Sequence, residues 1–316
     1  MSIPFSLMFY NTENFYDTAN DPYTMDDEFT PHGEMNWTEK RFNDKVTKFT
    51  NVVKDIVKPL TPDIIGLAEI ENKMVIMSIL DEFRLHGLQK YSFVHYDSPD
   101  ERGVDVAMIY NTESFLVLES NPILVHLSGV EDRTRDILHI KGKTITDVIL
   151  HLFIVHFPSR REGTDRSEPR RYFVASELRN GIKKTLSENP DENIVIMGDF
   201  NDTPDDNSID KVLGAEKSFE NISKHKLYNL MYIRHKRGIG SIFYTKWLLF
   251  DQFIVSGNVL LSDKIDCKPE YADVFNPPYL IHFDKKGRAN TNRTYRGKYT
   301  GGYSDHLPIF LKMQLR

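Results

Sequence analysis

The chain has 316 residues, of which 40% are hydrophobic and 27% are charged. This composition supplies enough apolar material for a globular core and excludes an intrinsically disordered protein. Forty lysines and arginines stand against 46 acidic residues, so the net charge is −6 and the surface as a whole does not attract polyanions. The one cysteine, Cys267, cannot form an internal disulfide, and no CxxC or HExxH pattern indicates a zinc site.

No run approaches the roughly 20 apolar residues that a membrane-spanning helix requires. The first 15 residues also lack the basic segment and apolar stretch that are typical of a signal peptide. We therefore expect a cytoplasmic protein. A secreted protein whose signal peptide has been removed stays open as the alternative.

Short apolar runs rich in β-branched and aromatic residues predict strands along the whole chain. They are Ile3–Tyr10, Asp63–Ile70, Tyr91–Tyr96, Val104–Tyr110, Phe115–Leu118, Ile137–Ile140, Val148–Val155, Ile194–Met197, Leu249–Val255 and Leu307–Lys312. Helical periodicity covers Glu39–Val57, Lys73–Leu85 and Ser167–Ser187. This mixture predicts an α/β (α+β) fold with two packed sheets covered by helices. Because no Gly/Ser/Pro-rich linker divides the chain, we predict a single domain over residues 1–316.

Several predicted strands stop at a carboxylate, an amide or an imidazole. In chain order these residues are Asn11, Glu69, His156, Asp199 with Asn201, Asp251, and Asp305 with His306. Each one taken alone is most often a turn former. Catalytic groups are often held at strand ends, and these residue types together complete a hydrolytic site.

Hydrolysis of a phosphate ester requires a cation on the phosphate, a base near the attacking water and donors for the developing charge. Glu69 can hold a hard divalent ion, for which Mg²⁺ is the natural choice and Mn²⁺ an alternative, because both suit oxygen ligands. Asp199 can accept a proton from water or orient it. Asn201 projects on the same side of an extended segment.

The remaining polar residues suit the phosphate itself. His306 can contact it while Asp251 holds the other ring nitrogen, a pairing that fixes the tautomer and favours the imidazolium. His156 and Arg135 can donate to the non-bridging oxygens.

These residues lie in motifs that resemble the endonuclease/exonuclease/phosphatase superfamily, which includes deoxyribonuclease-like enzymes. In family order the motifs are FYN at Phe9–Asn11, PDIIGLAEIEN at Pro62–Asn72, RGVDVAMIY at Arg102–Tyr110, VHFPSR at Val155–Arg160, MGDFNDTP at Met197–Pro204, LFDQFIVS at Leu249–Ser256 and SDHLPI at Ser304–Ile309. The resemblance covers almost the whole chain. The motifs resemble those of a bacterial branch of the superfamily whose members are described only as predicted nucleases.

The resemblance implies a four-layer α/β/β/α sandwich with the site at one edge, between the sheets. It implies that Glu69 is the principal metal ligand and that Asn11 and Asp305 help to arrange metal and phosphate. The residues with implied catalytic roles are His156, Asp199, Asn201, Asp251 and His306. Arg135 resembles an arginine on a comparable strand of deoxyribonucleases. Glu13 sits where some relatives place another metal-linked carboxylate and others do not.

Basic residues gather at two places beside the predicted site. One group follows His156 and consists of Arg160, Arg161, Arg166, Arg170 and Arg171. The other is the segment Lys285–Gly302, which runs into Asp305 and whose Tyr295 and Tyr299 either stack a base or pack the segment down. We expect the substrate to be bound by Arg135, Arg160, Arg170 and Arg171.

The leading hypothesis is a Mg²⁺-dependent phosphoesterase that cleaves phosphodiesters in nucleic acid. The alternative within the same chemistry is a phosphatase or phosphodiesterase of a small molecule or lipid headgroup. A catalytically dead binding module is a third reading. It fits poorly because Glu69, Asp199, Asn201, Asp251 and His306 are all present.

Overall fold

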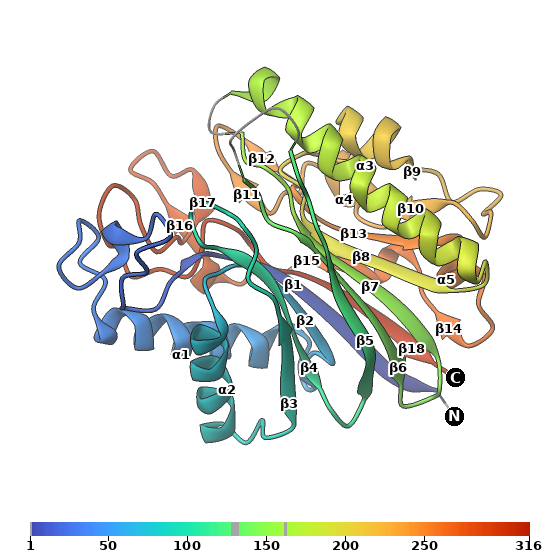
Figure 1. Ribbon diagram of the computed structural model, residues 1–316, viewed down its shortest axis with the longest axis horizontal. Helices are drawn as coiled ribbons and strands as arrows, with labels where there is room; N and C mark the ends of the chain where they lie inside the picture. The colour runs from blue at the N-terminus through green and yellow to red at the C-terminus, as the bar shows by residue number, and fades with distance from the viewer. Residues whose placement is uncertain (1, 128–132, 161–162) are drawn as a thin grey trace.

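The computed structural model describes residues 2–127, 133–160 and 163–316, and two seven-stranded sheets form its centre (Figure 1). The first sheet has the order β14-β18-β1-β2-β4-β3, with β15 also paired to β18. Its strands are β1 (Ile3–Phe15), β2 (Ile64–Ile70), β3 (Tyr91–His95), β4 (Asp105–Asn111), β14 (Ile265–Asp266), β15 (Ala272–Val274) and β18 (Ile309–Leu315).

The second sheet has the order β5-β6-β7-β8-β13-β10-β9. Its strands are β5 (Phe115–Ile123), β6 (Ile137–Thr144), β7 (Ile149–His156), β8 (Asn193–Asp199), β9 (Ala215–Glu216), β10 (Leu227–Asn229) and β13 (Asp251–Ser256). Two small hairpins lie outside these sheets. They are β11 (Ile242–Phe243) with β12 (Trp247–Leu248), and β16 (Ile281–Phe283) with β17 (Ala289–Thr291).

Helices cover the outer faces of both sheets, which gives the predicted four layers (Figure 1). On the first sheet lie α1 (Glu39–Ile56) and α2 (Lys73–Leu85); on the second lies α3 (Thr164–Glu188). Two short helices, α4 (Tyr232–Lys236) and α5 (Gly257–Leu261), join later strands. The helices follow their sequence signals, because α1 buries its apolar stripe and the Asn72 side chain caps α2.

The alternation of side chains along the strands of the second sheet builds two apolar cores. Along β8, Val195 and Met197 belong to the core between the sheets, whereas Ile194 and Ile196 pack with α3 on the other face. The sheets approach closely at Gly66 of β2, where an added Cβ would lie 2.8 Å from the Met197 sulfur. This parity also fixes which side chains at the end of each strand face the gap between the sheets.

The predicted α/β sandwich is confirmed, and each predicted strand and helix is present with bounds shifted by a few residues. The two- and three-residue strands and the short helices were not predicted, because so few residues carry no periodic signal. In the described part of the chain, no helix is both long and apolar enough to cross a membrane. The single domain and the cytoplasmic location stay predictions.

Candidate active site

Three polar side chains lie next to one another at the ends of neighbouring strands of the second sheet. His156, the last residue of β7, is in register with Asp199, the last residue of β8, and Asp199 is in register with Asp251, the first residue of β13. Each has the same parity as residues that face the first sheet, so all three side chains point into the gap between the sheets. The sequence predicts that these residues lie at strand ends, and the pairing register of the strands brings them next to one another.

Asp199 is the centre of this group and is almost fully buried. Asn11 from β1 of the other sheet donates its Nδ2 to Asp199 Oδ2 at 3.0 Å, and the backbone N–H of Asn201 donates to Oδ1 at 2.8 Å. His156 Nε2 and His306 Nε2 each lie 3.6 Å from Oδ2. One carboxylate therefore joins residues from both sheets.

His306 is held against Asp251, as the sequence analysis expected for this pair. Its Nδ1 lies 2.7 Å from Asp251 Oδ2, and both side chains are buried. Burial lowers the pKa of His306, but the carboxylates of Asp251 and Asp199 outweigh burial, so the pKa lies well above its ordinary value. His306 is therefore a cation at neutral pH, and its Nε2 faces Asp199.

The other two groups of this cluster are shifted toward their neutral forms. Burial raises the pKa of Asp199 to about 7, a value that suits a group that exchanges protons near neutral pH. Burial and the positive charge of Arg135 hold the pKa of His156 well below its ordinary value. His156 is thus a neutral imidazole beside His306, which is charged.

Glu69 is the second-to-last residue of β2 on the first sheet, and it faces this cluster. Its Oε2 accepts the backbone N–H of Asn14 at 2.7 Å, and its Oε1 lies 3.3 Å from Arg102 Nη1 and 3.9 Å from His156 Nε2. Burial raises the pKa of Glu69, but the charge and hydrogen bond of Arg102, with the hydrogen bond from the Asn14 N–H, outweigh burial, so the net shift is downward. Glu69 is an ionised carboxylate at the edge of the site.

The backbone is strained around these side chains. Four residues without the freedom of glycine have positive φ angles here, namely Glu13 at 53°, Asn14 at 50°, Glu69 at 61° and Asn201 at 48°. Such conformations cost free energy, and they persist where surrounding contacts hold them, often at functional sites. The cluster of strained residues supports a functional role for this edge of the sandwich.

Asp305 is linked to Glu13 by Arg293, a residue of the C-terminal segment. Arg293 donates to Asp305 Oδ2 at 2.9 Å and to Glu13 Oε1 at 3.0 Å. Lys45 of α1 donates to the backbone carbonyl of Glu13 at 2.6 Å. Burial and the charge of Asp305 raise the pKa of Glu13 to about 7, although Lys45 and Arg293 act in the opposite direction.

Glu69, Asn11 and Asp305 supply oxygen donors only, and this donor chemistry fits a hard divalent cation. Asn11 belongs to the network around Asp199, and Glu69 reaches the same network at His156. Asp199, Asp251 and His306 also offer ligand atoms that lie within 4.8 Å of one another. This closely spaced group does not include Glu69 or Asp305, so a cation held by those two residues stays a prediction.

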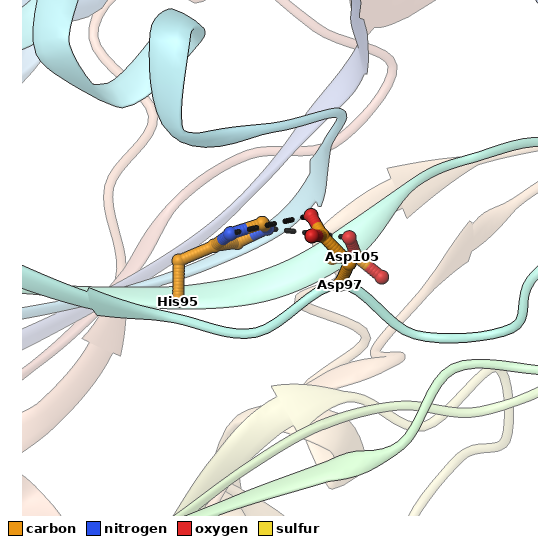
Figure 2. A group of neighbouring side chains, drawn as sticks. All are labelled: His95, Asp97 and Asp105. Carbon is orange, nitrogen blue, oxygen red and sulfur yellow. Dashed lines mark ion pairs between the residues drawn. The ribbon is translucent and has the colours of Figure 1, made fainter. Parts of the chain in front are cut away.

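A second group that could hold a metal ion lies at the β3–β4 connection, where Figure 2 shows His95 beside Asp97 and Asp105. His95 Nε2 lies 3.2 Å from Asp105 Oδ2, and Nδ1 lies 3.9 Å from the exposed Asp97. Asp105 also accepts the backbone N–H of Ser98 at 3.0 Å. These contacts anchor both ends of the connection that carries Arg102.

Two arginines of the expected substrate-binding set are paired with carboxylates inside the protein. Arg171 is fully buried, and its Nε lies 2.8 Å from Asp202 Oδ1. Arg160 also pairs with Asp202 and lies 2.7 Å from Asp206. These two side chains join α3 and the segment before it to the segment after β8. Their role in substrate binding stays a prediction. Arg161 lies outside the described residues.

Arg135 and Arg170 instead line the same hollow near the end of β7. Arg135 donates to Asp100 at 2.8 Å and to the carbonyl of Phe157, the residue after His156, at 3.1 Å.

Tyr295 and Tyr299 were expected either to stack a base or to pack the segment Lys285–Gly302 down, and packing fits the structure. The centroid of the Tyr295 ring lies 5.7 Å from that of Phe29 and 5.6 Å from that of Tyr299.

Two arginines that hold the carboxylates of the site were not predicted from the sequence. Arg102 pairs with Glu69 and with the Asn14 side chain, while Arg293 joins Asp305 to Glu13. Both arginines stood within segments already singled out, at the start of RGVDVAMIY and inside Lys285–Gly302. Their position next to conspicuous carboxylate motifs was the available signal.

A family model described as the Endonuclease/Exonuclease/phosphatase family matches residues 6–315. The chain therefore belongs to this family, whose members are hydrolases of phosphodiester bonds and generally use a divalent metal ion. The search of curated protein sequences gives no match.

Solved structures share the fold over their whole length. An endonuclease/exonuclease/phosphatase family protein from Bacteroides thetaiotaomicron matches with a TM-score of 0.56 and 14% identity, covering 100% of this chain and 99% of that one. D. rerio TDP2, complexed with a single-strand DNA product, matches at 0.58 and 13%, covering 98% of each chain. The human Nocturnin catalytic domain, with bound sulfate, matches at 0.57 and 13%, covering 100% of this chain and 97% of that one. At these identities the likeness shows the fold alone.

Proposed function

We propose that this protein is a Mg²⁺-dependent phosphodiesterase that acts on nucleic acid. The observation that carries the proposal is the buried cluster in which Asp199 lies 3.6 Å from both His156 and His306, beside the ionised Glu69. The cluster combines a group that exchanges protons, a cation and oxygen ligands, which are the components that phosphodiester hydrolysis requires.

In this proposal each side chain has a separate task. Asp199 accepts the proton of the attacking water. The Asn201 backbone N–H and the Asn11 side chain fix the orientation of the Asp199 carboxylate through their hydrogen bonds to it. His306, kept charged by Asp251, and the neutral His156 donate to the phosphate oxygens. When bound at Glu69, Asn11 and Asp305, a divalent ion would neutralise phosphate charge and polarise the phosphorus–oxygen bonds.

Nucleic acid is the favoured substrate class because arginines surround the site, and because TDP2 with the same fold is described in complex with a single-strand DNA product. The net charge of −6 favours the second candidate, a small phosphodiester or phosphomonoester, since it provides no broad basic face for a duplex. A catalytically dead module would lack one of the central groups.

A substrate panel tests this proposal. Purified protein in Mg²⁺ is assayed against linear and circular DNA, RNA, bis(4-nitrophenyl) phosphate and inositol phosphates. We expect cleavage of nucleic acid and slow cleavage of the generic diester. Release of inorganic phosphate from inositol phosphates, with no cut in any nucleic acid, would instead establish the second candidate.

A further inference from the structure

The β3–β4 connection brings a histidine and two aspartates together at the edge of the first sheet, where β3 is the last strand. His95 ends β3 and lies opposite Ala107 of β4 in the antiparallel register. The same register, continued two residues past the end of β3, pairs Asp97 with Asp105, the first residue of β4. Side chains two residues apart on an extended segment point to the same side, so the three side chains lie together on one face (Figure 2).

The ligand atoms of these three residues are spaced as they would be around a small cation. Each residue offers one atom, and the three atoms lie within 4.8 Å of one another. His95 Nε2 lies 3.2 Å from Asp105 Oδ2. Two ligands bound tetrahedrally to a zinc ion, each at about 2.0–2.1 Å, are roughly 3.3 Å apart, so this pair already has the separation that zinc requires. Asp97 is exposed and can complete the site from the solvent side together with water.

The His95 imidazole lacks a partner that its burial requires. Its side chain is 4% exposed, and Nε2 makes no hydrogen bond to any described residue, although Asp105 Oδ2 is close enough to accept one. Buried polar atoms are nearly always satisfied, so an unpartnered nitrogen beside a buried carboxylate indicates a bound ion or an ordered water. The other oxygen of Asp105, Oδ1, accepts the backbone N–H of Ser98 at 3.0 Å and leaves Oδ2 available.

The donor types decide which ion fits. One imidazole nitrogen with two carboxylates suits Zn²⁺, whereas Mg²⁺ prefers oxygen ligands and retained water. The double charge of the ion also balances the two carboxylates.

We propose that His95, Asp97 and Asp105 form a zinc site, separate from the candidate active site. This group shares no residue with the group of Asp199, Asp251 and His306. A bound zinc ion would fasten the two ends of the β3–β4 connection to each other and stabilise the folded form of that segment.

The test is isothermal titration calorimetry of metal-free protein with Zn²⁺, in excess Mg²⁺ to occupy sites for harder ions. The wild-type protein should bind one more zinc ion than His95→Gln. Loss of a hydrogen bond to a metal-binding side chain typically costs about 10–100-fold in metal affinity, so loss of the Asp97 ligand in Asp97→Asn should cost at least ~10-fold. His282→Gln and Asp263→Asn change exposed residues outside the site and should bind zinc as the wild-type protein does.

Zinc should also raise the melting temperature of the wild-type protein more than that of His95→Gln, because an ion bound to the folded state stabilises it. Asp97 is exposed, so its variant stays informative if His95→Gln unfolds. Zinc held by the active-site group is common to all these proteins and cancels in the comparison. Equal zinc stoichiometry and affinity in the wild-type protein, His95→Gln and Asp97→Asn would overturn the proposal. Unchanged affinity in Asp97→Asn alone would contradict the three-ligand site.

Discussion

Asp199 accepts hydrogen bonds from residues of both sheets and lies at equal distance from two imidazoles, so its charge state affects the whole cluster. His306 is charged and His156 is neutral, although both face the same carboxylate oxygen. The difference comes from Asp251, which holds Nδ1 of His306, and from Arg135, which disfavours a charge on His156. Two histidines of one site thus have different chemical properties.

We predict that Asp199→Asn lowers kcat by at least ~10² with little change in KM, because asparagine keeps the shape and cannot accept the proton. His306→Ala should cost at least as much. If the two residues act as one unit, the double variant is scarcely slower than the slower single variant. Steady-state kinetics with melting temperatures measure this. Retention of more than about half of kcat in a stable Asp199→Asn protein would remove Asp199 from the mechanism.

At the scale of elements, an apolar face and a buried ion pair attach α3 to the second sheet and to the segment that follows β8. Arg171 is fully buried against Asp202, which also pairs with Arg160. We predict that Arg171→Ala destabilises the fold by roughly 3 kcal/mol, because Asp202 loses a partner inside the protein. Chemical denaturation measures the loss. An unchanged unfolding midpoint together with a raised KM for oligonucleotides would restore Arg171 to the substrate-binding residues.

Two histidines, His139 on β6 and His151 on β7, lie next to each other on the outer face of the second sheet. His139 Nε2 lies 2.9 Å from His151 Nδ1, and the His139 ring stacks on Phe153 with 4.3 Å between the ring centroids. Burial and the neighbouring His151 lower the pKa of His139 to about 4. The unfolded chain therefore binds more protons than the folded chain between about pH 6.5 and pH 4, so the free energy of unfolding falls as the pH falls through that window.

We predict that His139→Gln reduces this acid-induced loss, because glutamine does not titrate. The measurement is the melting temperature of both proteins from pH 7.5 to pH 4. His86→Gln, at the exposed C-cap of α2, is the matched control for the change of a histidine to glutamine elsewhere in the protein. Parallel curves for the wild-type protein and His139→Gln would show that this pair does not cause the acid sensitivity.

At the scale of the whole molecule, the sequence predicted most of the sandwich because its long strands are continuous apolar runs and α1, α2 and α3 have clear periodicity. The polar residues at the strand ends could also be recognised, since an imidazole or carboxylate after a buried strand is conspicuous. The strand register that brings His156, Asp199 and Asp251 together depends on pairing between distant segments, which local patterns do not encode.

The different surroundings of the arginines near the site could not be predicted for the same reason. Arg171 and Arg135 look alike in the sequence, as basic residues near motifs. Their roles differ because Asp202 buries one and the hollow beside β7 receives the other. Burial partners come from other elements, so a basic run cannot be divided into ion pairs and phosphate ligands before the fold is known. Arg102 was missed for this reason too.

Hydrolysis at this site should depend on a bound divalent metal ion, and the rate of bis(4-nitrophenyl) phosphate hydrolysis after removal of metal measures that dependence. Wild-type protein is assayed in EDTA and again after addition of Mg²⁺ or Mn²⁺, beside Glu69→Gln, which keeps the side-chain shape and lacks the ionised carboxylate. We predict that activity disappears in EDTA, that it returns with either ion, and that Glu69→Gln requires a higher metal concentration at an unchanged melting temperature. Full activity of the wild-type protein in EDTA would show that hydrolysis does not require a metal ion.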